Sequence, residues 1–198
     1  MKPKIVLFFL LFFASITLLF YILNRQMETD YNRRQRVTLE MEQSFNRMNE
    51  ELNKTLINTE FQKIMLEDTL SNEVPLSKLA SQSPLLIFRF SELNCSSCYE
   101  TELFSLHDFF STKNRQIAIL GSYRERRHYI MFKRGNRIEL PFYRIPHDAF
   151  DWTLEDYGSP YYFILHPDMT VSHIYIPDQV FPELNKQYLE RVKNFLSD

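Results

Sequence analysis

The chain contains two cysteines, Cys95 and Cys98, separated by two residues. A short apolar run, 85–88, precedes them and follows Pro84, which predicts a buried strand. Apolar residues recur at helical spacing over 103–110, so the cysteines should lie where a strand passes into a helix. Free backbone N–H groups and the helix dipole stabilise negative charge at such a junction, which favours thiolate at Cys95. Thiolate is the reactive form of cysteine, and this spacing also lets the two sulfurs join as a disulfide.

Two other interpretations of the cysteine pair are inert core residues and a structural zinc site. Free cysteines are often inert and buried in a core, but here the chain's only two cysteines fall at reactive spacing and at a helix start. A structural zinc site needs about four ligands, and the sequence has no second cysteine pair to supply them. We therefore expect redox chemistry and no metal at Cys95 and Cys98.

Length, composition and charge exclude several classes of function. The chain has 198 residues, enough for one domain with additional segments. The formal net charge is −2, which does not favour a nucleic acid partner. Only 3 residues are glycine, and no glycine-rich phosphate loop is present. The sequence therefore gives no reason to expect a bound cofactor.

The N-terminus has the pattern of a membrane anchor. Residues 5–23 carry no charge, and a helix of that length spans about 28 Å, close to the hydrocarbon thickness of a bilayer. Lys2 and Lys4 precede the run, and no small-residue cleavage site follows it. We predict a transmembrane signal-anchor over 1–24 in the cell inner membrane, with the C-terminal domain facing the periplasm. A cleaved signal peptide is the alternative, and the arginines that follow the run oppose this orientation without excluding it.

Residues 25–73 are predicted to form a helical spacer. The part up to residue 71 has no glycine or proline and is rich in residues that suit a helix. A short heptad seam could give a weak homodimer through residues 38–59. The alternative is a helix that packs on the folded domain. The seam is formed by Met41, Phe45, Met48 and Leu52, and the packing alternative would use Leu56, Phe61, Ile64 and Met65.

The folded domain is predicted over 74–198, with strands and helices in alternation. This alternation favours an α/β fold with a parallel sheet, to which a final hairpin adds an antiparallel edge. A basic segment over 123–134 is interpreted as a solvated face, with a surface for an acidic partner as the alternative. The expected strands are 85–90, 117–120, 142–145, 161–165 and 171–176, and the expected helices are 75–79, 96–110, 149–157 and 184–196.

This order, with Cys-x-x-Cys at the start of the first long helix, resembles the thioredoxin family. It is most similar to the membrane-anchored, periplasm-facing thiol–disulfide oxidoreductases. The marks are Cys95-Ser96-Ser97-Cys98 after an apolar strand, Ser159-Pro160 before the strand at 161–165, and the hairpin with its closing helix. The resemblance predicts a thioredoxin-like mixed sheet flanked by helices.

The resemblance also implies roles for individual residues. Cys95 would attack and Cys98 would resolve, with protein thiols and disulfides as clients. Ser159 and Pro160 would match the family's cis-proline loop, which faces the cysteines and binds the client backbone, so we expect a cis Ser159–Pro160 bond against Cys95. The family's buried acid falls on Arg89, where an arginine near the sulfurs would favour thiolate.

Three functions remain open on the sequence alone. The first is thiol–disulfide exchange on extracytoplasmic proteins through Cys95 and Cys98. The second is a membrane-anchored copper-delivery protein of the same fold, with His173 joining the two cysteines as a ligand, since thiolates suit Cu(I). The third is a redox-inactive module that only binds a partner.

Overall fold

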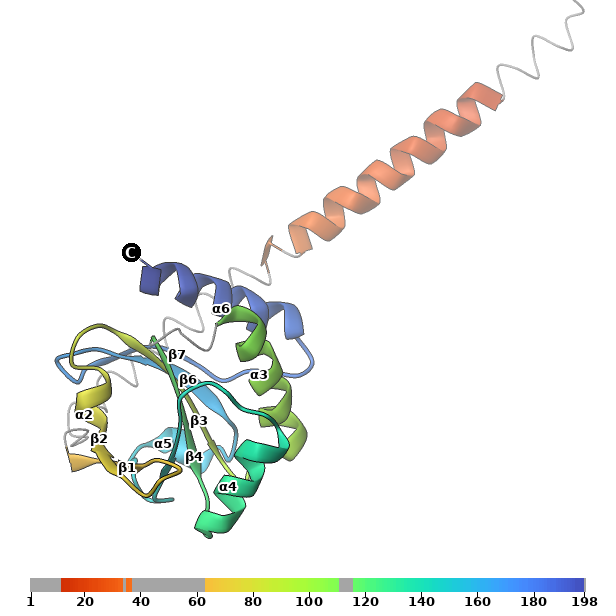
Figure 1. Ribbon diagram of the computed structural model, residues 1–198. Helices are drawn as coiled ribbons and strands as arrows, with labels where there is room; N and C mark the ends of the chain where they lie inside the picture. Colours follow the sequence, from red (N-terminus) through yellow and green to blue (C-terminus); the bar gives the residue numbers. More distant parts are fainter. Residues whose placement is uncertain (1–11, 34, 37–62, 111–115, 198) are drawn as a thin grey trace, which may run out of the picture. The chain divides into compact units, whose positions relative to one another are not determined.

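The structure, a computed structural model, describes residues 12–33, 35–36, 63–110 and 116–197 (Figure 1). The chain divides into two compact units, Met1–Asn46 and Arg47–Asp198. Residues 1–11 of the predicted membrane segment lie outside the described residues, and so does all of the predicted dimer seam at 38–59.

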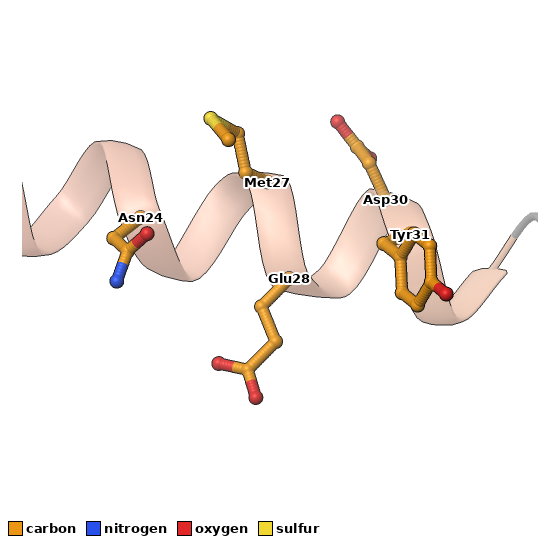
Figure 2. Close-up of a pocket in the computed structure, with 5 residues that line it drawn as sticks. All are labelled: Asn24, Met27, Glu28, Asp30 and Tyr31. Carbon is orange, nitrogen blue, oxygen red and sulfur yellow. The ribbon is translucent and has the colours of Figure 1, made fainter.

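The N-terminal unit contains a helix over residues 12–33. Among the residues that the structure describes, none of the helices is both long and apolar enough to cross a bilayer. A shallow hollow lies on this helix, and Figure 2 shows the side chains that line it: Asn24, Met27, Glu28, Asp30 and Tyr31. All five come from this single helix, so the hollow has only one wall and offers no enclosed binding site.

The described part of the second unit forms a seven-stranded mixed sheet in the order β2-β1-β5-β4-β3-β6-β7. Its centre is parallel, because β3 pairs with β4 and β4 with β5 in the same direction. The hairpin β6–β7 adds antiparallel strands beside β3, as the sequence predicted. The strands are β1 (Met65–Glu67), β2 (Glu73–Pro75), β3 (Leu85–Ser91), β4 (Ile117–Ser122), β5 (Phe142–Ile145), β6 (Tyr161–Leu165) and β7 (Val171–Tyr175).

Helices cover the sheet, and two of them pack against each other. The two longest helices of this unit, α3 and α6, lie side by side over the sheet (Figure 1). The predicted helix at 149–157 is shorter in the structure, because only a four-residue α5 forms within it. The helices are α2 (Leu76–Leu79), α3 (Ser96–Phe109), α4 (Arg126–Gly135), α5 (Thr153–Asp156) and α6 (Pro182–Ser197).

The start of the domain differs from the prediction, because β1 lies inside the segment expected to be a helical spacer. Leu66 is fully buried, whereas its neighbour Met65 is exposed, so this stretch alternates as a strand does. Glu67, opposite Arg144 of β5, pairs with Arg144 and, at 2.7 Å, with Arg126. Strand pairing and these ion pairs override the helix preference of methionine, leucine and glutamate. The sheet therefore begins at residue 65, before the predicted boundary at 74.

An aromatic cluster fills the space between the sheet and helices α3 and α4. Phe90 of β3 stacks on Tyr99 of α3, with ring centroids 4.6 Å apart, and on Phe142 of β5. Gly121 of β4 leaves room for these rings, since a Cβ atom there would lie 2.8 Å from the rings of Phe142 and Tyr123. The cluster fixes the first turn of α3, which carries the cysteines, against the sheet.

Candidate active site

Cys95 is the N-cap of α3, the residue that joins the end of β3 to the helix. Its carbonyl oxygen accepts the backbone N–H groups of Cys98 (3.0 Å) and Tyr99 (3.4 Å), which closes the first turn. Cys95 is exposed, Cys98 is half-buried, and both carry free thiols. The predicted strand-to-helix junction is thus confirmed, and it presents one sulfur to solvent and holds the other partly covered.

The Cys95 thiol is the more acidic of the two. The side chain of Cys98 donates to its sulfur, which is the main reason that the pKa of Cys95 is lowered. The Ser97 hydroxyl, 3.1 Å from the Cys95 sulfur, lowers the pKa further, and backbone N–H groups of the first helical turn also contribute. Cys95 therefore has the exposure and the acidity of an attacking thiol.

Cys98 has the opposite electrostatics. Burial, and after it the neighbouring Cys95, raise the pKa of the Cys98 thiol to about 11. A proton held by Cys98 keeps available the hydrogen bond that stabilises thiolate at Cys95. The two thiols are thus differentiated by their environment, in the direction that an attacking and a resolving cysteine require.

The loop that carries Cys95 is held by its own side chains. The Asn94 side chain accepts the backbone N–H of Ser91 at 2.6 Å, while the N–H of Asn94 donates to the carbonyl oxygen of Ser91 at 3.0 Å. The Ser91 hydroxyl in turn accepts the N–H of Leu93. Asn94 therefore closes the turn before the nucleophile.

Glu92 is tied to the same edge of the sheet. Its carboxylate accepts the backbone N–H of Arg124, which follows β4. The imidazoles of His128 and His147 lie 3.5 Å and 3.8 Å from its oxygens. Glu92 is therefore a fixed part of the site's rim, which links the loop before Cys95 to α4 and to the segment after β5.

Comparison with known proteins identifies the fold. No family model matches the sequence, and no curated protein is significantly similar to it. Solved structures do match. A thiol:disulfide interchange protein from Bacteroides sp. is 16% identical, with a TM-score of 0.51 over 68% of this chain and 86% of that one. A candidate protein disulfide isomerase from Bacteroides thetaiotaomicron gives the same identity, TM-score and coverage.

The domain has a thioredoxin-like fold. The predicted mixed sheet flanked by helices is thereby confirmed. At this level of identity the likeness shows the fold alone.

Arg89 does not act on the sulfurs as predicted. Its guanidinium is 1% exposed and forms two hydrogen bonds of 2.9 Å with the carboxylate of Glu155, which follows β5 on α5. It also lies over the ring of Phe150, 5.9 Å from the centroid. Side chains alternate along a strand, so Arg89 projects to the face opposite Phe90, whose ring packs on the cysteine helix. The causes of the lowered Cys95 pKa lie in the helix turn itself.

A buried acid is nevertheless present, on α3 and not on β3. Glu102 is 2% exposed and lies one helical turn after Cys98. Its carboxylate accepts the hydroxyl of Tyr162 (2.7 Å) and the side-chain amide of Asn185 (2.9 Å). Burial raises its pKa, and the two hydrogen bonds oppose that shift. The sequence indicates this buried acid, because Glu102 interrupts the apolar face of the predicted helix.

Ser159 and Pro160 lie where predicted along the chain, but their peptide bond is not the predicted one. The described residues contain no cis peptide bond, so the Ser159–Pro160 bond is trans and that prediction was wrong. Gly158, between α5 and β6, has a φ of +61°, a conformation that glycine adopts without steric cost. Pro160 is buried just before β6, and the Ser159 hydroxyl donates to the carbonyl oxygen of Tyr157 at 3.5 Å.

The register of the sheet shows where Ser159 and Pro160 lie relative to the cysteine loop. Tyr161 lies opposite Arg89 in the antiparallel pair of β6 and β3. Residues before Tyr161 therefore extend toward the end of β3 from which the cysteine loop leaves. The structure thus brings Cys95 and Cys98 together and puts Ser159 and Pro160 at the same edge of the sheet.

The side chain of His173 contacts residues of β7 and α6. Its imidazole lies 2.8 Å from the Ser172 hydroxyl and packs on the ring of Phe195 at 4.7 Å. Burial lowers its pKa. In the part of the chain that the structure describes, no three side chains of His, Cys, Asp or Glu are placed to hold a metal ion. This arrangement does not favour the copper-delivery alternative, which needs His173 beside the cysteines.

Proposed function

We propose that this protein catalyses thiol–disulfide exchange on other proteins through Cys95 and Cys98. The observation that carries the proposal is the opposite shift of the two thiols. The pKa of exposed Cys95 is lowered, whereas the pKa of half-buried Cys98 is raised to about 11. A pair of inert core cysteines would show neither this exposure nor this difference.

The chemistry follows from the two environments. The Cys95 thiolate attacks one sulfur of a client disulfide, forms a mixed disulfide, and releases the other client sulfur as a thiolate that takes a proton from solvent. Cys98 then loses its proton and attacks the Cys95 sulfur, which releases the second client thiol. The client is reduced by two electrons, and the protein is left with a Cys95–Cys98 disulfide. The reverse sequence oxidises a client.

The surroundings of Cys95 suit a protein client. Leu93, two residues before the nucleophile, is 78% exposed, so it offers an apolar contact beside the sulfur. Ser159, two residues before β6, lies at the same end of the sheet as the loop that leaves β3. We infer that an extended client segment meets this edge as its disulfide reaches Cys95.

Trapping tests the proposal. Cys98→Ser removes the resolving thiol, so mixed disulfides between Cys95 and client proteins should accumulate on a non-reducing gel and disappear with reductant. Cys95→Ser should give none, and the double serine variant is the control. The wild-type protein should also catalyse reduction of insulin disulfides by dithiothreitol. Identical behaviour of the two single variants, together with no insulin reduction, would refute the exchange function and favour a partner-binding module.

We also propose that exchange takes place outside the cytoplasm, with the chain held in the inner membrane by its N-terminal apolar run. Support comes from the uncharged run over 5–23 and the lysines before it. A membrane-impermeant maleimide, applied to reduced cells with a permeabilised outer membrane, should label Cys95 of the Cys98→Ser variant. Labelling that needs lysis of the inner membrane would refute this location.

A further inference from the structure

Ser97 lies between the two cysteines, and its hydroxyl has two neighbours. One is the Cys95 sulfur at 3.1 Å. The other is the side-chain nitrogen of Gln179, which donates to the same hydroxyl oxygen at 3.5 Å. Gln179 is 82 residues further along the chain, in the segment between β7 and α6. A residue from outside the cysteine motif thus contacts the group that contacts the nucleophile.

The segment that carries Gln179 is fastened to the cysteine helix by a buried amide. Asn185 is 5% exposed, and its oxygen accepts the hydroxyl of Tyr175 (2.6 Å) and the backbone N–H of Asp178 (3.1 Å). Its nitrogen donates to the carbonyl oxygen of Asp178 (3.1 Å) and to Glu102 of α3 (2.9 Å). Two of these four hydrogen bonds hold the backbone of Asp178, the neighbour of Gln179, and the bond to Glu102 connects Asn185 to α3.

The direction of the bonds matters for the nucleophile. A side-chain NH₂ group can only donate, so the Ser97 oxygen receives the proton of Gln179 and its own hydroxyl proton remains free. The Cys95 sulfur is the acceptor that lies within reach of that proton. A hydroxyl turned toward the sulfur stabilises the thiolate and not the thiol.

We propose that Gln179 is a positioning residue of the active site, which orients the Ser97 hydroxyl toward the Cys95 sulfur and so increases the reactivity of that thiol. Gln179 does not touch the reacting sulfur and acts through Ser97. The inference rests on the proposed function for its purpose, but the alkylation rate of Cys95 can be measured whether or not the protein exchanges disulfides.

The experiment measures alkylation of Cys95 by iodoacetamide in the reduced full-length protein, as a function of pH, with mass spectrometry to distinguish Cys95 from Cys98. Gln179→Met keeps the length of the side chain and removes its donor. Because a neutral hydrogen bond changes an equilibrium by a few-fold, this variant should alkylate about threefold more slowly near neutral pH, with its pH profile moved to higher pH. Gln187→Met, an exposed glutamine of α6, is the matched control and should leave the profile unchanged.

A double-mutant cycle then tests whether Gln179 acts on Cys95 through the Ser97 hydroxyl. Ser97→Ala should slow alkylation at least as much as Gln179→Met does, and adding Gln179→Met to Ser97→Ala should change nothing more. An unchanged profile in Gln179→Met would overturn the proposal. So would an equal effect of Gln179→Met with and without Ser97, since Gln179 would then act independently of the hydroxyl. Insulin reduction by the same proteins reports separately on the exchange function.

Discussion

The two faces of the sheet each bury a charged side chain, and they accommodate it differently. On one face Arg89 pairs with a carboxylate of opposite charge, Glu155, which also accepts the hydroxyl of Tyr161 at 2.6 Å. On the other face Glu102 is surrounded by neutral donors, the hydroxyl of Tyr162 and the amide of Asn185. Only the second arrangement belongs to the helix that carries the cysteines.

Because of this difference, the charge of Arg89 has a structural role, whereas the charge of Glu102 can change with pH. An ion pair with bidentate geometry fixes α5 against β3, and breaking it leaves an uncompensated charge. A carboxylate that has only neutral partners can take up a proton without leaving another charge unpaired, and the pKa of Glu102 is raised by its burial. We therefore expect the Arg89 face to govern stability, and the Glu102 face to make the domain sensitive to pH.

The largest effect should come from breaking the ion pair. Arg89→Met leaves Glu155 without its counter-charge and should lower the free energy of unfolding by about 3 kcal/mol, measured by urea denaturation. The double variant Arg89→Met with Glu155→Gln removes both charges, keeps an acceptor for the Tyr161 hydroxyl, and should recover most of that loss. Because Arg89 lies on the face away from α3, the alkylation profile of Cys95 should stay unchanged. A shift in that profile would mean that the two faces are not separate.

A smaller loss is expected on the other face. Tyr162→Phe removes the 2.7 Å hydrogen bond to Glu102 and should cost about 2 kcal/mol, because a hydrogen bond to a charged group is stronger than a neutral one. Tyr175→Phe removes a bond of similar length to the neutral amide of Asn185 and should cost about 1 kcal/mol. Equal losses in the two variants would show that Glu102 is protonated in the folded protein under the conditions used.

The smallest effect is the pH dependence that Glu102 confers. Since burial raises its pKa, the folded state binds this proton more tightly than the unfolded state does. Glu102 therefore makes the free energy of unfolding rise as the pH falls from neutral toward the ordinary pKa range of a carboxyl group. The rise ends once the pH is below that range, because Glu102 is then protonated in the unfolded state as well. The free energy of unfolding of the wild type, compared with Glu102→Gln from pH 7 to pH 4.5, should show this slope only where Glu102 is present. Glu100→Gln, on the same helix, is the control and should retain it.

Much of the fold could be predicted from the sequence, because its strands are marked by local patterns. The apolar runs at 85–90, 117–120 and 161–165 each became a buried strand, and the spacing after Cys98 predicted α3. β1 could not be predicted in this way. It has three residues of good helix formers, and its strand conformation depends on pairing with β2 and with β5, which lies far along the chain.

The part of the candidate site that lies within the Cys-x-x-Cys motif could be predicted from the sequence. Cys95 and Cys98 could be found from spacing alone. The helix start predicted the more acidic thiol correctly, although the Cys98 side chain is the main cause of the lowered Cys95 pKa and burial is the main cause of the raised Cys98 pKa. Gln179 gave no local signal, since an exposed glutamine before a helix has no distinctive pattern. The role expected for Arg89 was wrong because the sequence does not show which face of a fully buried strand a side chain enters, nor that Glu155 would meet it there.

The position of Trp152 has a practical consequence. It is the chain's single tryptophan, it is 5% exposed, and its indole N–H donates to the hydroxyl of Tyr161 within the Arg89 network. Its fluorescence therefore originates across the sheet from the cysteine helix. We expect the emission spectrum to report unfolding of the domain and to stay nearly constant when the cysteines are oxidised or reduced. Intrinsic fluorescence should thus follow folding in either redox state without a correction for quenching by the disulfide.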